Sequence, residues 1–293
     1  MKSNILHLIT QFVFSCFLLF ILFPVYGQTI AGRVVNSSTK EPIEYVNIGI
    51  VNTTIGTVTN ATGNFVLHLK DQPPESIVRF SMIGFKPVGF TIQELTEIEN
   101  IIELVDEPYE LEAVQISPKG KVRDIGIKDR SLFKVCGWGG TQRGKGHEIG
   151  TKMDLGESPV KLKSLHVRLH SQSFDSSLFR LHIRDINNNI PDKELLKENV
   201  FIGISKEKGW VEINLNSYDI ILKGEVALSL EWLNVFGLNE DKLSRVNKTK
   251  KPMANVLFCV SKKKGRVFTR WGSEAQWNAH ESNIPSFYLT VVE

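Results

Sequence analysis

The fold is decided by a turn and the short alternation that follows it, Asn60-Ala61-Thr62-Gly63-Asn64-Phe65-Val66-Leu67-His68-Leu69 (residues 60–69). From Phe65 to Leu69 every second side chain is large and apolar, which is the period of a β-strand with one face against a core. The small and polar residues around Gly63 are typical of a turn. The stretch therefore predicts a half-buried strand of a small antiparallel sheet.

The same alternation recurs on both sides of this stretch. It is found at Ile30, Gly32 and Val34, at Val46, Ile48 and Ile50, and at Val78, Phe80 and Met82. Turn-forming residues separate these runs, at residues 37–42 and 71–74. No helical period of 3.6 residues persists, so we expect residues 28–117 to fold as an all-β sandwich.

Six short motifs follow one another in this region. They are Gly32-Arg33-Val34, Glu41-Pro42-Ile43, Val46-Asn47-Ile48, Gly56-Thr57-Val58-Thr59-Asn60, Gly63-Asn64-Phe65 and Phe80-Ser81-Met82-Ile83-Gly84-Phe85. In order and spacing they resemble the carboxypeptidase regulatory-like domain family, and residues 111–116 are similar to the closing strand of that family. The resemblance implies a transthyretin-like, seven-stranded β-sandwich. It also implies a non-catalytic module, of the kind attached to peptidases, outer-membrane receptors and other envelope proteins.

The resemblance does not imply peptidase activity. A zinc carboxypeptidase needs a His-x-x-Glu pair and a distant His as ligands, with a further Glu as the base. None of the histidines is followed by Glu three residues later, and no His-Glu-x-x-His motif occurs. The Asp that the family usually has before the glycine of the Gly63 turn is also absent. We therefore expect no metal site and no cofactor.

The first residues have the three parts of an export signal. Lys2 supplies the charged start, the apolar stretch runs from Phe12 to Phe23, and the small Gly27 precedes a cut ahead of Gln28. We expect residues 1–27 to be a cleaved signal peptide, with no transmembrane segment after cleavage. The alternative is an uncleaved anchor, because residues 5–25 would span about 31 Å as a helix. The predicted location is extracytoplasmic: periplasmic, outer-membrane associated or secreted.

A second module is expected after residue 117. We interpret residues 118–130 as a linker, because turn formers and charges occur there without an apolar period, and we expect relative motion of the two modules. Strand-like runs resume at 165–169, 179–183, 211–215, 226–233, 256–261 and 287–292. Residues 131–293 therefore predict a second β-sandwich with a jelly-roll-like arrangement.

The charge pattern does not favour nucleic acid as a partner. The formal net charge of the chain is +3, and Lys2 would leave with the signal peptide. Basic runs at residues 248–251 and 262–266 have no interleaved aromatic residues and are typical of solvated turns. The expected partner is an envelope protein or a glycan.

Two of the strand-like runs predict a cationic face if their strands are neighbours. The outward positions are His166, Arg168 and His170 in one run and Arg180, His182 and Arg184 in the other. Such a face would bind a sulfate, phosphate or uronate group through bidentate arginine contacts. A shared zinc ion is excluded for His166 and His170, which lie about 13 Å apart along a strand. The alternative is an ordinary solvated face of an antiparallel sheet.

All five tryptophans lie in the second part of the chain. Trp232 shares a face with apolar residues, which predicts a place in the core. Trp210, Trp271 and Trp277 are the candidates for an exposed aromatic platform that binds sugar, and the alternative for each is a buried anchor.

Cys136 and Cys259 remain after signal cleavage. They could form a disulfide in an oxidising compartment, or they could be two separately buried thiols. Cys136, with His147 downstream, is also the nearest candidate for a nucleophile, and no Gly-x-Ser-x-Gly motif occurs. We therefore predict a non-catalytic binding or scaffolding protein of the cell envelope. The alternatives are a carbohydrate-binding protein that acts through the second sandwich, and an envelope hydrolase.

Overall fold

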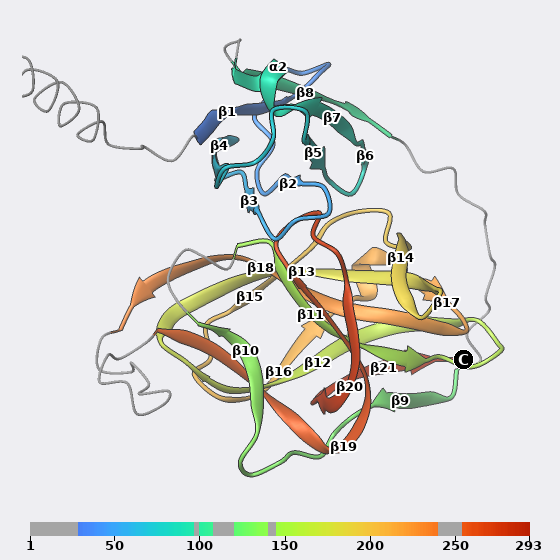
Figure 1. Ribbon diagram of the computed structural model, residues 1–293. Helices are drawn as coiled ribbons and strands as arrows, with labels where there is room; N and C mark the ends of the chain where they lie inside the picture. The colour runs from blue at the N-terminus through green and yellow to red at the C-terminus, as the bar shows by residue number, and fades with distance from the viewer. Residues whose placement is uncertain (1–28, 97–99, 108–119, 140–144, 240–253) are drawn as a thin grey trace, which may run out of the picture.

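The computed structural model describes residues 29–96, 100–107, 120–139, 145–239 and 254–293. These residues form two groups of strands, β1 to β8 in a first module and β9 to β21 in a second (Figure 1). The predicted all-β, sandwich-like fold is confirmed. The predicted signal peptide at 1–27 and the expected closing strand at 111–116 lie outside the described residues. Within those residues, no helix has the length and apolar character needed to cross a membrane.

The first module is a sandwich of two four-stranded sheets. One sheet has the order β4 (Asn64–His68), β1 (Thr29–Asn36), β8 (Asn100–Asp106) and β6 (Phe85–Lys86). The other has the order β3 (Gly56–Val58), β2 (Asn47–Ile50), β5 (Ile77–Ser81) and β7 (Val88–Thr91), and helix α2 (Ile92–Thr96) follows β7. The described part of the module thus has one strand more than the seven that the resemblance implies.

The alternation in residues 65–69 works as predicted. Phe65 and Leu67 are buried, whereas Val66 between them is 51% exposed. The Phe65 ring packs edge-on against Phe80 of the opposite sheet, with ring centroids 5.4 Å apart. Gly63 in the preceding turn has a φ of +75°, a backbone conformation that glycine adopts without steric cost.

The second module is one continuous set of thirteen strands in two layers. The first layer contains β9 (Val122–Gly126), β10 (Val135–Gly139), β12 (Val160–Gln172), β16 (Gly209–Asn214), β17 (Ile221–Leu222) and β21 (Phe287–Val292). The second layer contains β11 (His147–Asp154), β13 (Phe174–Asn187), β14 (Ile190–Glu194), β15 (Val200–Ile204), β18 (Glu225–Leu238) and β20 (Asn278–Pro285). Strand β19 (Asn255–Trp271) joins the layers, because its first residues pair with β10 and β12 and its last with β11 and β20.

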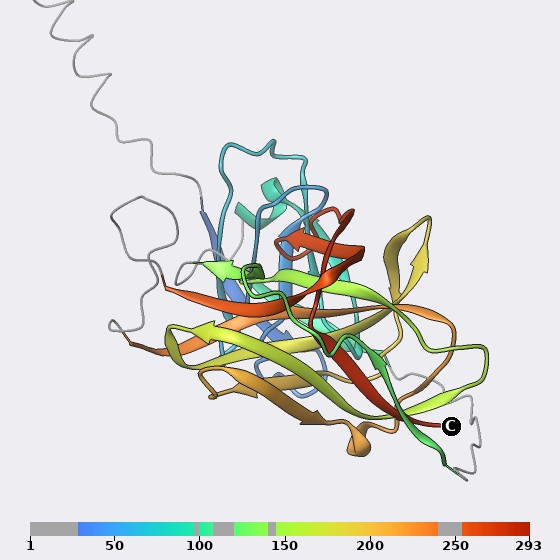
Figure 2. The same cartoon turned by 90° about the horizontal axis from the view of Figure 1, so that it is seen from below.

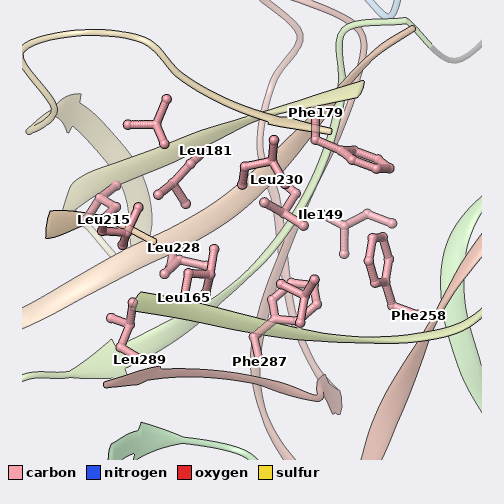
Figure 3. Close-up of a cluster of buried hydrophobic side chains, with 14 of the residues drawn as sticks. Ile149, Leu165, Phe179, Leu181, Leu215, Leu228, Leu230, Phe258, Phe287 and Leu289 are labelled. Carbon is pink, nitrogen blue, oxygen red and sulfur yellow. The ribbon is translucent and has the colours of Figure 1, made fainter. Parts of the chain in front are cut away.

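The hydrophobic core of the second module lies between these layers (Figure 3). Leu165 and Leu289 enter it from the first layer, and Leu181 and Leu230 enter it from the second. All four are 0% exposed. Burying a side chain of this size contributes about 1.5–3 kcal/mol. Because side chains alternate along a strand, the residues between these leucines point away from the core, and these outer positions hold the candidate sites.

Strand β9 corrects the predicted domain boundary. The linker was expected at residues 118–130, but Val122–Gly126 pair with β21, with Ile125 opposite Leu289, and Ile125 packs against the core. The second module therefore begins by Val122 and not at residue 131. The strand is short, charged and pairs on one side, which is the character of an edge strand and which conceals its period in the sequence.

The two modules are in contact through polar groups, and the expected relative motion of the modules stays a prediction. Two contacts meet at Asn47 of β2: Arg180 Nη2 donates to its Oδ1 at 2.9 Å, and Ser273 Oγ donates to the same oxygen at 3.4 Å. The backbones are also in close contact, since a Cβ on Gly49 would lie 1.9 Å from the Ser273 carbonyl oxygen. In the view from below, the second module lies in front of the blue and teal strands of the first (Figure 2).

Candidate functional site

Seven charged residues, six of them buried, gather on the outer face of the second layer, next to the first module. This charged cluster consists of Arg180, His182 and Arg184 on β13, Glu148 on β11, Glu194 on β14, Glu231 on β18 and Arg270 on β19. Strand register brings them together. Arg180 lies opposite Glu231, and Glu148 lies opposite Glu231 on one side and Arg270 on the other.

Arg180 connects the charged cluster to the first module. Its side chain is fully buried, and Nε donates to Glu231 Oε2 at 2.9 Å. Nη2 crosses the module boundary and donates to the Tyr45 carbonyl oxygen at 2.8 Å and to Asn47 Oδ1 at 2.9 Å. Nη1 donates to Asn199 Oδ1 at 3.0 Å. An arginine fits this position because its planar fork of donors can hold a carboxylate and the oxygens of a second module at once.

Glu148 is shared by two arginines. Arg184 Nη1 donates to Glu148 Oε2 at 2.7 Å, and Arg270 Nε donates to Oε1 at 2.9 Å. Burial alone would raise the pKa of Glu148, but the two guanidinium groups outweigh burial and hold that pKa well below its usual value. Trp277 covers both arginines, with its ring centroid 5.3 Å from Cζ of Arg184 and 5.0 Å from Cζ of Arg270. The Trp277 ring is partly exposed and is engaged by the two arginines.

His182 bridges two carboxylates. Its Nδ1 lies 2.6 Å from Glu194 Oε2 and its Nε2 lies 2.9 Å from Glu231 Oε2. Because a carboxylate only accepts hydrogen bonds, an imidazole that donates from both nitrogens is a cation. Burial and the Arg184 charge oppose that state, but Glu148 and Glu194 outweigh them and raise the pKa of His182.

Three of these residues have metal-ligand geometry. Atoms of Glu148, His182 and Glu231 that could ligate a metal ion all lie within 4.8 Å of one another. The same carboxylates are the partners of Arg180 and Arg184, and a metal ion would require His182 to lose its proton. The chemistry of the donor set therefore fits an internal ion-pair network better than a metal centre.

A second polar surface lies on the outer face of the first layer. We call it the aromatic layer; it consists of Lys128, His166, Arg168, Trp210 and Tyr288. The His166 ring stacks on Tyr288 at 4.1 Å, and Trp210 meets Tyr288 edge-on at 5.0 Å. Lys128 Nζ lies 4.7 Å from the Tyr288 centroid, and Arg168 Cζ lies 5.3 Å from the Trp210 centroid. These rings are occupied by the chain's own cations, which leaves little free platform for a sugar.

The six basic residues predicted to share one exposed face are divided between the two layers. Strands β12 and β13 follow each other in the chain but do not pair: β12 pairs with β16, β17, β19 and β21, and β13 with β14, β15 and β18. His166 and Arg168 belong to the aromatic layer, and His170 is exposed near the end of β12. Arg180, His182 and Arg184 point away from the core as predicted, but they are buried beside the first module.

A groove of about 830 Å³ opens between β3 and β4 of the first module and the start of β11 in the second. The residues lining this inter-module groove include Thr54, Thr57, His68, Lys70, Lys145 and His147. Trp271, which is 45% exposed, packs edge-on against His147 with ring centroids 5.3 Å apart. Burial lowers the pKa of His147 to about 4 and also lowers the pKa of Lys145.

The two cysteines have free thiols on paired strands. Cys136 lies opposite Phe258 and Cys259 lies opposite Val135, so the two side chains point to opposite faces and do not face each other. This arrangement corresponds to two separate thiols, of which Cys259 is buried and Cys136 is partly buried, and not to a disulfide. Burial raises the pKa of Cys136 to about 12, so this thiol is not an activated nucleophile at neutral pH.

The sequence did not predict the three acids of the charged cluster or Lys145 of the inter-module groove. Glu231 offered a signal, because it stands inside the apolar run of residues 226–233, where a buried acid requires a buried partner. Glu148 and Lys145 offered no comparable signal, since their surroundings depend on strands that are distant in sequence. Ser273 stands in the polar stretch between Trp271 and Trp277, and its contact with Asn47 exists only once the modules pack.

The folds and contacts together define a protein of two β-sandwich modules joined through a buried polar interface. Residues 30–116 match the family described as CarboxypepD_reg-like domain. The first module is therefore a carboxypeptidase regulatory-like domain, as the sequence motifs predicted. No curated protein matches the chain.

Among solved structures, the chain is similar to a clostridial cysteine protease, Cwp84 after propeptide cleavage, with 8% identity and a TM-score of 0.36 over 91% of this chain. The cysteine protease and lectin-like domains of Cwp84, a surface layer associated protein of Clostridium difficile, give 9% identity and a TM-score of 0.31 over 91% of this chain. This chain spans 65% and 58% of those two chains. The Gt strain of infectious bursal disease virus gives 7% identity and a TM-score of 0.22, covering 90% of this chain and 59% of that one. At these identities and TM-scores, the similarities do not assign a function to this chain.

Proposed function

We propose that this chain is an exported, non-catalytic binding or scaffolding protein of the cell envelope. The observation that carries the proposal is that the charged cluster connects the two modules. Its acids and bases are paired with one another, and Arg180 uses its remaining donors to hold Tyr45 and Asn47 of the first module. A constellation with acid and base groups thus serves to hold two modules together. The regulatory-like family of the first module, a non-catalytic family found in envelope proteins, supports the same function.

The hydrolase alternative has less support. A catalytic cysteine needs a thiolate and a neighbouring base, but burial raises the pKa of Cys136 to about 12. His147 lies on β11 and lines the inter-module groove, while Cys136 packs against the core beside Phe258. We therefore propose that neither residue takes part in a reaction. Turnover of peptide or ester substrates by the purified protein, lost in both Cys136→Ala and His147→Ala, would contradict this.

Carbohydrate binding through the second sandwich is the second candidate function. It is favoured by Trp271, which keeps 45% of its surface exposed and packs against His147, a residue that lines the inter-module groove. The other two candidate tryptophans give weaker support, because Trp210 and Trp277 are each engaged by arginines of the chain. An aromatic face beside polar groups is a common arrangement for binding an amphipathic ligand.

The export part of the proposal is tested by expressing residues 1–293 and residues 28–293 side by side in a Gram-negative host. We expect the longer chain in the extracytoplasmic fraction with Gln28 as its first residue, and the shorter chain in the cytoplasm. Recovery of an intact N-terminus in the membrane fraction would instead support the uncleaved anchor. Cross-linking of the exported chain in its own cells, followed by identification of the linked species, tests the binding or scaffolding part. The absence of any linked envelope component would contradict that part.

A further inference from the structure

We propose that the inter-module groove is a binding site for an acidic saccharide, one that carries carboxylate or sulfate groups. The site uses both modules, since β3 and β4 form one side and Lys145 and His147 form the other. The proposal names a ligand class for the proposed binding function and rests on that function, but it does not depend on export or on a protein partner. Its physical basis is the charge, the size and the aromatic margin of the groove.

The charge of the groove favours an anion. Among the described residues that line it none is acidic, while Lys70, His68, Lys145 and His147 all contribute nitrogen groups. Hydrogen bonds between a charged donor and a carboxylate or sulfate oxygen are about twice as strong as neutral ones. A ligand with spaced negative charges could use Lys70 on one wall and Lys145 on the other.

Lys145 combines partial burial with the lack of an acidic partner among the described residues. Some other lysines are paired with acids, among them Lys152 with Glu225 at 2.6 Å and Lys40 with Glu103 at 2.6 Å, both near the surface. Lys145 is half-buried and lines the groove without such a pair. Removing a charge from water without a partner is costly, and an incoming anion would remove that cost.

The size and surroundings of the groove favour a saccharide over a small inorganic anion. A volume of about 830 Å³ is far larger than a single sulfate requires, and falls in the range of about 300–1,000 Å³ that small-molecule sites occupy. The Thr54 and Thr57 side chains add hydroxyl groups that can donate to and accept from sugar hydroxyls. Trp271 at the margin presents an exposed ring, and its partner there is the His147 ring and not an arginine.

The test uses the chain from residue 28 to residue 293, which contains both modules, in titration calorimetry. The ligands are a hexamer of galacturonic acid, a sulfated saccharide of similar length and the neutral hexamer maltohexaose. We expect the uronate or the sulfated saccharide to bind, the stronger of the two identifying the acidic group, and maltohexaose not to bind. Lys145→Glu should weaken the binding at least about tenfold, which corresponds to about 1.4 kcal/mol. Trp271→Ala should weaken it about threefold or more.

Matched variants separate the groove from diffuse charge. Lys152→Glu reverses a charge on β11, the strand that follows Lys145, at a lysine that is paired with Glu225, and Trp210→Ala removes an aromatic residue of the aromatic layer. Both should bind as the unaltered chain does. Lys70→Glu, at an exposed position on the opposite wall, replaces Lys145→Glu if the latter does not fold, as judged by circular dichroism.

Three outcomes would overturn the proposal: no binding of either acidic saccharide, equal binding of maltohexaose, or a loss in Lys152→Glu as large as that in Lys145→Glu. The export and cross-linking experiments are unaffected by any of these. A failure of the groove is therefore distinguishable from a failure of the proposed function.

Discussion

The charged cluster and the aromatic layer begin from the same kind of sequence and end in opposite environments. On β12, His166 and Arg168 alternate with core residues and remain at the outer surface, where they pack on Tyr288 and Trp210. On β13, Arg180 and His182 alternate with core residues in the same way, yet they are 0% and 2% exposed. The difference lies in what covers each face. The first module and the carboxylates of neighbouring strands cover β13, whereas solvent reaches β12.

The comparison shows what an alternating pattern can and cannot specify. It fixes which side chains point away from the core, because this follows from the geometry of one strand. It does not fix whether the outer face meets water or another module. Arginine is compatible with both, since it can lie over an exposed ring or donate several hydrogen bonds in a buried interface.

The largest effect is expected from Glu148→Gln, which removes the charge that Arg184 and Arg270 share. Arg270 would then be buried without its counter-charge, and Arg184 would keep only Glu194, whose Oε2 lies 3.5 Å from Arg184 Nε. Breaking a buried ion pair by removing one partner costs about 3–5 kcal/mol. The free energy of unfolding from urea titration should fall by this amount.

The matched change is Glu212→Gln, beside His166 of the aromatic layer. The Glu212 side chain is 69% exposed on β16, where His166 is its nearest partner at 4.0 Å. This variant should change the free energy of unfolding by no more than about 0.5 kcal/mol. Equal effects of the two substitutions would remove the distinction between the charged cluster and the aromatic layer.

The next largest effect is expected from Gly49→Ala, at a position where the first module packs on the second. The nearest atoms to a Cβ at Gly49 belong to Ser273 and Glu274 of the second module, the first at 1.9 Å. The added methyl group should therefore separate the modules without disturbing the core of either, at a cost of about 1–3 kcal/mol. Scanning calorimetry should show two transitions in place of one. Gly203→Ala on β15, where a Cβ meets nothing within 4 Å, is the control and should keep a single transition.

Several parts of this arrangement could be predicted from the sequence. The first sandwich follows from runs such as residues 65–69 and from the family motifs, and the core position of Trp232, which is 2% exposed, follows from its apolar neighbours. The pairing of β12 with β21 could not be predicted, since nothing local selects a partner more than a hundred residues away. The same reason hid Glu148 as the partner of Arg184. The basic residues of the charged cluster were thus predicted, but their acidic partners and the first module that covers them were not.

The pH dependence of stability should differ in sign between the histidines of the two regions. The pKa of His182 is raised in the folded protein, so its contribution is fully present below its ordinary value of 6.5 and is lost as the pH rises through the folded pKa. Glu148, Glu194 and Glu231, which face it together with Arg184, have lowered pKa values. Their contribution is present above about 4.5 and is lost as the pH falls.

The measurement is the difference in unfolding free energy between the unaltered chain and His182→Gln at several pH values. This difference cancels the opposing effect of His147, whose pKa is lowered to about 4 in both chains. It should be largest between about pH 4.5 and pH 6.5 and should decline as the pH rises further. For His166→Gln the difference should instead decline as the pH falls below 6.5, because burial lowers the pKa of His166. The same slope for both histidines would contradict the assignment of His182 as a cation held by carboxylates.

A small effect is expected from Arg168→Gln, the counterpart of Arg180 in the aromatic layer. Arg168 lies over the Trp210 ring at a partly exposed position, where a cation–π contact contributes about 0.5–1 kcal/mol. The variant should lose no more than that in urea titration and should keep a single calorimetric transition, because Arg168 does not reach the first module. Solvent can hydrate the groups that this substitution leaves without a partner, whereas no solvent reaches the Arg180 position, which is 0% exposed. A loss of module packing in Arg168→Gln would mean that the outer face of β12 is also covered, and the contrast between the two strands would then fail.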